Sequence, residues 1–573
     1  MGASGKVLVV GDDTRSFLAT VRSLGRRGLE VHVAPYQLGA PALRSKYIRA
    51  IHRLPYYLDG GERWLQAVEA LFRTERFDLV IPCEERALLP LYRHRDVLEP
   101  LCRLAIPDAA ALAAFFDKYS TRELAAGAGV PVPRGRLLSV ADTSETLLAE
   151  FSLPLVLKHR RSYSWQELYV RKAAAVVETR AELAHWLQAN RDEIDQVFAE
   201  AYFAGLGGGV SVLCDHGRVL LAFEHQRAHE VTGSSFYRRS MAIDRARRDA
   251  VAAMAAAIGY TGLAMFEFKL DTQSGAWRLL EVNARPWGSL PLPVALGVDF
   301  PYGLYRLLVD GQALPPAEYR PDMYARNFIP DLWQVRSALP RLRGWAARLG
   351  HLGAWLWEFR RIPSGREVQD VWVRDDPAPA YAELRQFARD RLDSLRAVDA
   401  SAGRARRENE RRRLAAALGA ARAPATILFL CQGNICRSPY AEHKLRQLLP
   451  ADAALRIGSA GMLPRNARPS PPAALAAAAR RGVDLAGHRS QHAWAETVAQ
   501  AAVILIFDQV NRRSFEARYP ELRERVFLLS ALDNAGSETE IADPDGKSEA
   551  FFASTYERID RCTERLARLV AEH

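Results

Sequence analysis

The fold of the C-terminal part of this chain is decided by one stretch, Cys431-Gln432-Gly433-Asn434-Ile435-Cys436-Arg437-Ser438-Pro439. The short apolar run before it, Ala425–Leu430, is typical of a buried parallel strand. The residues after it, Tyr440–Leu449, have apolar side chains at helical spacing. The sequence therefore predicts a tight loop that carries a cysteine and an arginine between a strand and a helix.

The predicted loop suits the binding of an oxyanion. Its backbone N–H groups and the N-terminus of the following helix form a cradle for negative charge. Arg437 can hold two oxygens of a phosphate in a bidentate fork. Because Cys431 lies at the end of the strand, this positive environment favours its thiolate, which can attack phosphorus and form a cysteinyl-phosphate.

A phosphoryl transfer of this kind needs an acid, because the leaving alkoxide or phenoxide must take up a proton. The polar stretch 542–546, which reads Ala-Asp-Pro-Asp-Gly, supplies a candidate shortly before the last predicted helix. Asp543 is the expected general acid, and the stiff Pro544 holds it in place. We therefore expect Cys431, Arg437 and Asp543 to meet in one catalytic site.

With these residues in place, the region from about Thr426 to His573 resembles the low-molecular-weight protein tyrosine phosphatases, whose loop Cys-x-Gly-Asn-Ile-Cys-Arg-Ser-Pro is present without change. The resemblance implies a flavodoxin-like parallel-sheet domain over 425–573, with Cys431 as nucleophile, Arg437 as phosphate binder and Asp543 as acid. It also implies a second loop cysteine that can trap an oxidised nucleophile as a disulfide. The residues that it assigns to the phosphate loop and its hydrogen bonds are Gly433, Asn434, Ile435, Cys436, Ser438, Ser459 and His488.

The phosphatase substrate stays open between a phosphotyrosine protein and a phosphorylated metabolite. The family usually has an aromatic residue two positions after the acid, and this chain has Asp545 there. Two related classes are disfavoured. Arsenate reductases need further redox cysteines, of which only Cys562 remains, and protein arginine phosphatases typically carry threonine at the position of Ile435.

Length and composition limit the class of protein. The chain has 573 residues, enough for about three or four domains. No apolar run is long enough to span a membrane, and the N-terminus lacks the apolar core of a signal peptide. The six cysteines favour a reducing cytoplasm. The net charge of +11 is expected to be solvated surface or to attract anionic substrates, and without a binding motif no nucleic-acid partner is expected.

The N-terminal region, about 1–115, is predicted to be a Rossmann-like α/β domain. Strands are expected at Val7–Val10, Val31–Ala34 and Asp78–Pro82, with a helix at Ser16–Arg27. The Gly-x-Gly-x-x-Gly fingerprint of dinucleotide-binding domains is absent. Two glutamates follow the third strand, and they either contact a ligand or act as charges at a helix N-terminus; these are Glu84 and Glu85.

Residues 116–315 contain a pattern of oxygen ligands on paired strands. Strands are expected at Leu263–Leu270 and at Trp277–Val282, with a turn between them. Because strand side chains alternate, Glu281 and Asn283 face the same side. Together with Glu267 they supply the hard oxygen ligands that suit Mg²⁺ on nucleotide phosphates. Arg285 would neutralise the γ-phosphate of ATP or an acyl-phosphate.

This pattern resembles the ATP-grasp superfamily, in particular the carbamoyl phosphate synthetase-like carboxylate–amine ligases, over about residues 1–315. The resemblance implies an α+β ATP-grasp domain behind the Rossmann-like one, with ATP and Mg²⁺ as cofactors. The residues that it assigns are Lys118, Lys158, Glu200 and Arg285 for ATP, Glu267, Glu281 and Asn283 for magnesium, and His225 and Arg227 for the substrate. The family's glycine-rich flap is replaced by the Arg-rich stretch 159–165, and the glycines 207–209 are expected in a turn.

The remaining regions complete the predicted order of domains. Residues 316–398 are expected to form a helical extension of the ligase half. The Ala- and Arg-rich residues 399–424 are expected to be a linker, either irregular or helical. Two functions follow from this organisation. One is a bifunctional cytoplasmic enzyme that joins a small-molecule carboxylate to an amine with MgATP and hydrolyses phosphate monoesters. The alternative is a phosphotyrosine-protein phosphatase whose ATP-grasp half is inert and regulatory.

Overall fold

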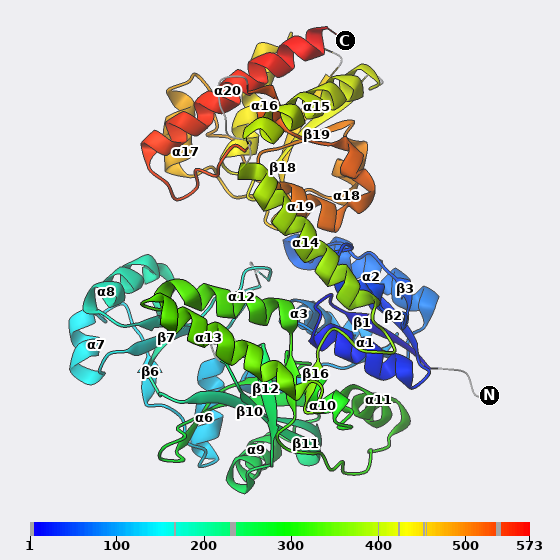
Figure 1. The fold of residues 1–573 in the computed structure, drawn as a ribbon, viewed down its shortest axis with the longest axis vertical. Coiled ribbons are helices and arrows are strands. Elements are labelled where there is room, and N and C mark those ends of the chain that lie inside the picture. The colour runs from blue at the N-terminus through cyan, green and yellow to red at the C-terminus, as the bar shows by residue number, and fades with distance from the viewer. Residues whose placement is uncertain are drawn as a thin grey trace. The chain divides into compact units, whose positions relative to one another are not determined.

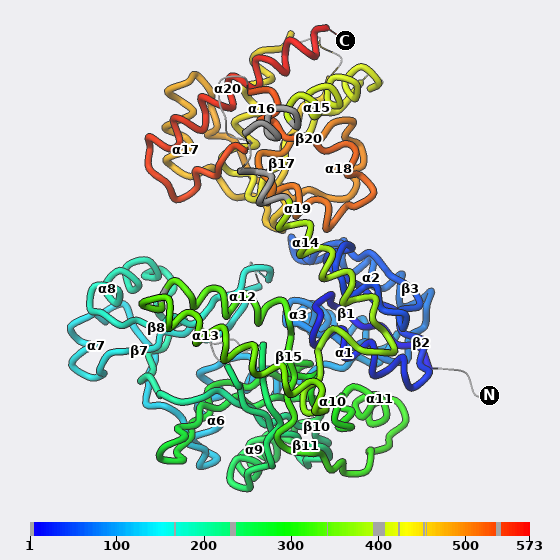
Figure 2. The backbone as a smooth tube through the Cα atoms, in the orientation of Figure 1, coloured from blue at the N-terminus to red at the C-terminus, as the bar shows by residue number. Residues whose placement is uncertain are grey.

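The computed structural model describes residues 5–165, 168–229, 236–398, 400–421, 424–450, 453, 455–533 and 540–572, apart from the side chains of 341 and 393–406. The chain divides into two compact units (Figures 1 and 2). The first unit comprises Met1–Pro35, Pro41–Arg53 and Leu65–Leu384. The second unit comprises Tyr36–Ala40, Leu54–Trp64 and Arg385–His573.

The first unit begins with a parallel sheet in the order β3-β2-β1-β4-β5. Its central strands are apolar on both faces and buried, as a parallel sheet covered by helices requires. This confirms the Rossmann-like fold expected near the N-terminus. The elements are β1 (Lys6–Val10), α1 (Ser16–Arg26), β2 (Glu30–Ala34), β3 (Ile48–Ile51), α2 (Glu62–Glu75), β4 (Leu79–Pro82), α3 (Glu85–Arg93), α4 (Arg95–Leu98) and β5 (Arg103–Leu104).

A small antiparallel sheet follows, in the order β6-β9-β7-β8. The alternating residues of β7 bury one face against a core that also contains helices α7 and α8. Here the elements are α5 (Ala109–Phe115), α6 (Lys118–Gly127), β6 (Gly135–Leu137), α7 (Ser144–Glu150), β7 (Leu155–His159), β8 (Ala175–Val177), α8 (Arg180–Ala189) and β9 (Val197–Ala201).

The largest sheet of the first unit has seven strands in the order β14-β13-β10-β11-β12-β15-β16. Strands β10, β11, β13 and β14 pair antiparallel and pack on α5, α6 and α9, which places the ends of β13 and β14 at a cavity described below. The elements are β10 (Leu206–Asp215), β11 (Arg218–Arg227), β12 (Tyr237–Met241), α9 (Arg245–Ala257), β13 (Gly262–Leu270), β14 (Trp277–Asn283), α10 (Pro291–Ala295) and α11 (Phe300–Asp310).

Two expectations for this region are wrong. The glycines 207–209 do not form a turn but lie inside β10, where a side chain would collide with the neighbouring strand. The stretch 316–398 is not only helical, because β15 (Tyr324–Arg326) and β16 (Glu367–Gln369) complete the large sheet. Its helices are α12 (Phe328–Ala338), α13 (Trp345–Glu358) and α14 (Ala378–Val398).

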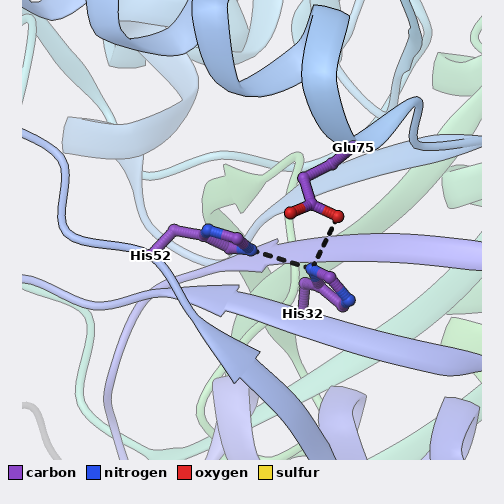
Figure 3. A group of neighbouring side chains, drawn as sticks. All are labelled: His32, His52 and Glu75. Atoms are coloured by element: carbon purple, nitrogen blue, oxygen red, sulfur yellow. Dashed lines mark hydrogen bonds and ion pairs between the residues drawn. The ribbon is translucent and has the colours of Figure 1, made fainter.

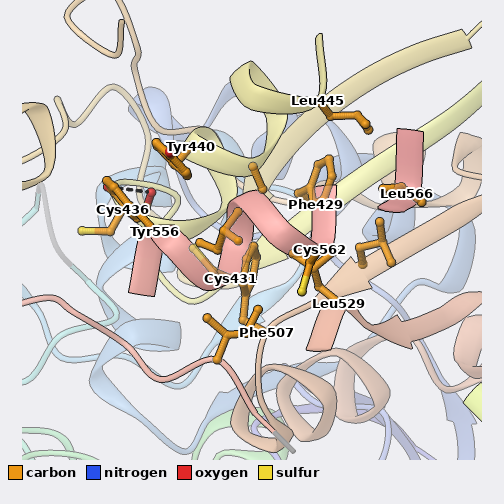
Figure 4. Packing of buried hydrophobic residues seen from close by; sticks show 14 of the residues in the cluster. Phe429, Cys431, Cys436, Tyr440, Leu445, Phe507, Leu529, Tyr556, Cys562 and Leu566 are labelled. Atoms are coloured by element: carbon orange, nitrogen blue, oxygen red, sulfur yellow. Dashed lines mark hydrogen bonds between the residues drawn. The ribbon is translucent and has the colours of Figure 1, made fainter. Parts of the chain in front are cut away.

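The second unit contains a parallel sheet in the order β18-β17-β19-β20. Figure 4 shows part of its core, in which Phe429, Phe507 and Leu529 pack against the long α20. The elements are α15 (Ala400–Gly419), β17 (Ala425–Cys431), α16 (Arg437–Leu448), β18 (Leu455–Gly461), α17 (Pro472–Ala479), α18 (Ala495–Gln500), β19 (Val503–Ile506), α19 (Gln509–Arg518), β20 (Val526–Leu528) and α20 (Glu549–Ala571).

The segment expected to be a linker is helical over most of its length. Leu414 and Leu418 of α15 are buried in the core of the second unit. The C-terminal half of this helix therefore belongs to the packed unit, because its apolar side chains cover the sheet. Among the described residues, no helix combines the length and the apolar character that a membrane crossing requires.

Candidate active sites

The loop between β17 and α16 curls around the sulfur of Cys431. The strand ends at Cys431 and the helix begins at Arg437, close to the expected boundaries. The Sγ of Cys431 accepts a hydrogen bond from the backbone N–H of Asn434 at 3.2 Å and lies 3.1 Å from the Oγ of Ser438. Hydrogen bonds of this kind favour a sulfur that carries negative charge.

Asn434 holds the loop in shape. Its backbone is left-handed, with φ at +51°, and its side chain is fully buried. The side-chain amide donates to the Oγ of Ser438 at 2.9 Å and of Ser459 at 2.8 Å, and its Oδ1 accepts from the N–H of Gln491 at 2.9 Å. The Nε2 of His488 lies 2.7 Å from the backbone carbonyl oxygen of Asn434. The structure thus brings together the residues expected to support the loop.

Arg437 lies buried beside the loop, with 1% of its side chain exposed. Its Nη1 donates to Asp508 and to the carbonyl of Ile541 at 2.9 Å, and its Nη2 donates to Oδ2 of Asp543 at 2.6 Å. Burial alone would lower the pKa of Arg437, but Cys431, Asp543 and Asp508 raise it above the ordinary value. The guanidinium therefore stays charged in the site.

Asp543 reaches this arginine from the loop before α20. Its side chain is 46% exposed, whereas the following Pro544 is buried and anchors the loop. Asp545 is exposed and donates its backbone N–H to Oδ1 of Asp543 at 3.3 Å. Cys431, Arg437 and Asp543 therefore meet in one site, although Asp543 lies more than a hundred residues after the other two in the chain.

Cys436 differs from Cys431 in its surroundings. Burial raises the pKa of the Cys436 thiol well above its ordinary value. The hydroxyl of Tyr556 donates to the Cys436 carbonyl at 3.2 Å, and the ring of Tyr556 stacks on that of Tyr440. The thiol of Cys436 is therefore expected to remain protonated when the loop is reduced.

Three residues of this site were not predicted from the sequence. Asp508 caps α19 and pairs with Arg437, and Glu442 accepts a hydrogen bond from Ser459. Gln491 donates its N–H to Asn434. Only Asp508 had a visible signal, because it follows the buried strand β19 and precedes a helix, as an N-cap does.

A second candidate site lies in the first unit, in a cavity of about 420 Å³. Glu267 and Glu281 face each other across β13 and β14, and the amide of Asn283 lies 3.3 Å from Oε1 of Glu281. All three line the cavity, as expected for residues on one face of paired strands. The predicted substrate and phosphate contacts His225, Arg227 and Arg285 line it too.

The predicted lysines lie beside this cavity and do not line it. Lys158 pairs with Glu200 at 3.0 Å, and Lys118 donates to Ser162 at 2.7 Å. Burial lowers the pKa of Lys118. Burial alone would raise the pKa of Glu281, but Lys118 and Lys158 hold it below its ordinary value. Glu281 therefore remains a carboxylate between the lysines and the cavity.

Several charged groups of the cavity already have partners. Arg227 pairs with Glu267, and Arg285 donates to Glu85 at 3.2 Å. Glu85 is the first residue of α3 and lines the cavity. Burial lowers the pKa of His225 to about 3, and this imidazole is therefore neutral. Four arginines that line the same cavity were missed by sequence reasoning: Arg15, Arg86, Arg171 and Arg238.

The Arg-rich stretch that replaces the glycine-rich flap is partly engaged elsewhere. Arg160 pairs with Asp117 at 2.8 Å, and its carbonyl accepts from the N–H of Lys118. Asp117 also caps helix α6. Arg160 therefore ties the flap to the start of α6, which leaves the neighbouring Arg161 as the exposed cation of this stretch.

Comparison with known proteins finds a family model for a part of each unit. A family model described as low molecular weight phosphotyrosine protein phosphatase matches residues 426–573. A second, described as ATP-grasp in the biosynthetic pathway with Ter operon, matches residues 194–327. The matched ranges contain the Cys431 loop and the paired strands β13 and β14, respectively.

Individual relatives match the second unit. The probable low-molecular-weight protein-tyrosine-phosphatase EpsP of Ralstonia nicotianae is 35% identical over 136 residues, which is 24% of this chain and 89% of the relative. Etp of Escherichia coli K12, from the same family, is 32% identical over 143 residues, which is 25% of this chain and 93% of the relative.

Solved structures resemble the first unit more distantly. An L-amino acid ligase from Bacillus licheniformis is 19% identical and covers 56% of this chain and 79% of its own, with a TM-score of 0.42. The N5-carboxyaminoimidazole synthetase of Staphylococcus aureus in complex with ADP is 16% identical and covers 59% and 86%, with a TM-score of 0.46. Through residues 426–573 the chain is an enzyme of the low-molecular-weight protein-tyrosine-phosphatase family, and it joins that domain to a region that matches an ATP-grasp family model.

Proposed function

We propose that the second unit hydrolyses phosphate monoesters through a cysteinyl-phosphate. The observation that carries this proposal is the convergence of three groups: the hydrogen-bonded sulfur of Cys431, the buried charge of Arg437 and the carboxyl group of Asp543. A phosphate dianion would replace Asp543 and Asp508 as the partner of Arg437, because a bidentate guanidinium–phosphate pair satisfies both nitrogens.

In the first step the Cys431 thiolate attacks phosphorus, so an S–P bond forms and the P–O bond to the leaving group breaks. Asp543, protonated at the start, gives its proton to the leaving oxygen. In the second step water attacks phosphorus, Asp543 takes a proton from it, and the S–P bond breaks to release inorganic phosphate. Arg437 and the loop N–H groups stabilise the equatorial oxygens in both transition states.

The substrate of this unit is proposed to be a phosphotyrosine protein or a small phosphorylated metabolite. The relatives named above are protein-tyrosine phosphatases, which favours the first class. The exposed Asp545, at a position where the family usually carries an aromatic ring, favours the second. Comparing kcat/KM for phosphotyrosine peptides and for small alkyl phosphates separates the two, because only a protein phosphatase gains from the peptide flanks.

For the first unit we propose MgATP-dependent ligation of a small-molecule carboxylate to an amine through an acyl-phosphate. The cavity residues fit MgATP, because Glu267, Glu281 and Asn283 offer the oxygen ligands that Mg²⁺ prefers and Arg285 offers a cation for a phosphate. Mg²⁺ would neutralise phosphate charge there. Arg160 and Arg161, in place of a glycine-rich flap, instead favour an inert, regulatory ATP-grasp half.

One experiment tests each unit. Phosphate release from an aryl phosphate should be abolished by Cys431→Ser and largely retained by Cys436→Ser; equal losses would contradict the assignment of the nucleophile. ADP release by the full chain with a panel of amino acids should require Mg²⁺. Failure to bind MgATP at millimolar concentration would favour the regulatory function.

Because no cysteine forms a disulfide, a reducing cytoplasm is the proposed compartment.

A further inference from the structure

A cluster of metal-binding side chains lies in the first unit, in the sheet β3-β2-β1-β4-β5 (Figure 3). His32 is on β2, His52 directly follows β3, and Glu75 is the last residue of α2. Their ligand atoms all lie within 4.8 Å of one another. None of these residues lines the ATP-grasp cavity, so the proposed ligase chemistry does not account for them.

The hydrogen bonds of His32 fix which of its nitrogens can bind a cation. Its Nε2 lies 2.8 Å from Oε1 of Glu30, and a carboxylate accepts, so this nitrogen carries the proton. In the neutral ring the lone pair is then on Nδ1, which lies 2.8 Å from Nε2 of His52 and 3.7 Å from Oε2 of Glu75. Glu30 thus acts as the outer carboxylate that orients many metal-binding histidines.

The scaffold holds these groups on rigid elements. Glu30 and His32 are two residues apart on β2, so their side chains lie on the same face of the sheet. The backbone N–H of His52 donates to the carbonyl of Val33 at 2.8 Å, which fixes His52 beside β2. The ring of Phe77 packs edge-on against both imidazoles. His32 is buried, while His52 and Glu75 are partly exposed, which leaves an entry path for an ion.

The charge of the cluster also favours a cation. Lys6 pairs with Glu75 at 3.0 Å and lies 3.7 Å from Glu30. The two carboxylates and the one ammonium leave one net negative charge beside the imidazoles. A divalent ion bound between the imidazoles and Glu75 would share the Glu75 carboxylate with Lys6. The lysine therefore lowers the affinity of the site for the ion but leaves the ligand atoms accessible.

We propose that His32 Nδ1, His52 Nε2 and Glu75 form a binding site for a borderline divalent cation of the Zn²⁺ type, with Glu30 as the orienting residue. Two imidazoles and one carboxylate are a ligand set that suits Zn²⁺, with a water molecule in the fourth position. Binding at Nε2 of His52 requires that the proton which this nitrogen donates to His32 be replaced by one on Nδ1 of the same ring, by exchange with solvent. The bound ion would link β2, through His32, to the end of the edge strand β3 and to the end of α2.

The test measures zinc bound to the full chain after chelator treatment, by dialysis against Zn²⁺ buffered with a competing ligand. The wild type should bind one more equivalent than His52→Gln or Glu75→Gln. His216→Gln and Glu69→Gln are the matched controls, because they remove the same side chains from exposed or partly exposed positions elsewhere in the unit and should bind as the wild type does. The difference between variants is the readout, since the thiolate of Cys431 can also bind zinc.

Two further variants distinguish an ion site from a network of ion pairs. Glu30→Gln should weaken zinc binding by roughly 10–100-fold, the usual effect of losing an orienting partner. Lys6→Met should tighten it, because a competing cation is removed. Equal zinc in the wild type and His52→Gln, or weaker binding in Lys6→Met, would overturn the proposal. Cobalt substituted at this site should show ligand-field bands without sulfur charge transfer, and these bands should vanish in His52→Gln.

Discussion

Arg437 and Asp543 are joined by an ion pair of 2.6 Å between Nη2 and Oδ2, although one is fully buried and the other is nearly half exposed. The pair places a carboxyl group at the rim of the loop that surrounds Cys431. A carboxyl in this place can give a proton to a leaving group while the guanidinium holds the phosphate. The predictions for the second unit follow from this relationship.

Asp543→Asn should lower kcat for an aryl phosphate by roughly 10²–10⁴-fold, because an amide cannot donate the proton. The loss should shrink for leaving groups of low pKa, which need no protonation, and a series of substituted phenyl phosphates measures this dependence. Asp545→Asn is the matched control and should retain the wild-type dependence. If Asp545→Asn changes it and Asp543→Asn does not, the acid has been assigned to the wrong residue.

Asn434→Ala should destabilise the second unit and impair catalysis. The left-handed backbone at this position costs an alanine about 1–2 kcal/mol, and the buried hydroxyls of Ser438 and Ser459 lose their donor. Asn434→Gly removes the same hydrogen bonds without the backbone strain. Urea unfolding should therefore rank the stabilities as wild type, then glycine, then alanine. Equal stability of the two variants would mean that strain in the loop has no part in its stability.

The sequence predicted the nucleophile, the arginine and the acid because each stands in a local pattern of strand, loop and proline. The position of Asp508 before a helix marks an N-cap, but its pairing with Arg437 could not be predicted, because the parallel sheet brings together residues that lie 71 positions apart. The glycines 207–209 were misplaced for a similar reason. They look like a turn, but they lie in β10 beside β11, and an added Cβ would meet Arg227 at Gly207 and His225 at Gly209.

Glu281→Gln should remove Mg²⁺-dependent ATP turnover by the first unit and leave phosphatase activity unchanged. The substitution removes one of the two carboxylates that face each other across β13 and β14, so a Mg²⁺ site loses a charged ligand. ADP release at saturating MgATP measures the effect. Glu99→Gln, at the exposed residue that follows α4, is the control and should retain turnover. Unchanged turnover in Glu281→Gln would place the metal elsewhere.

His229 should make the stability of the first unit dependent on pH. Burial alone would lower its pKa, but Asp331 and Glu358 raise it to about 9. This value exceeds the pKa of about 6.5 that histidine has in an unfolded chain. Protonated His229 therefore contributes fully to the free energy of unfolding below about pH 6.5. The contribution is lost as the pH rises through about 9.

His229→Gln should therefore lower the urea midpoint at pH 6 and have little effect above pH 10. Tryptophan fluorescence mainly reports unfolding of the first unit, because of the eleven tryptophans only Trp64 and Trp494 belong to the second unit. The exposed His216, changed to glutamine, provides the control. An equal loss at both pH values would show that His229 acts through packing and not through its charge.

The covalent intermediate tests the central claim most directly. The full chain is mixed with an aryl phosphate, quenched in acid within the turnover time, digested, and examined by mass spectrometry for a phosphoryl group on the peptide that contains Cys431–Pro439. We predict a phosphoryl group on Cys431 and none in Cys431→Ser. With a leaving group of low pKa, which forms the intermediate without an acid, Asp543→Asn should accumulate more of it because hydrolysis of the intermediate is slowed. A phosphoryl group on another residue, or rapid turnover by Cys431→Ser, would contradict the account.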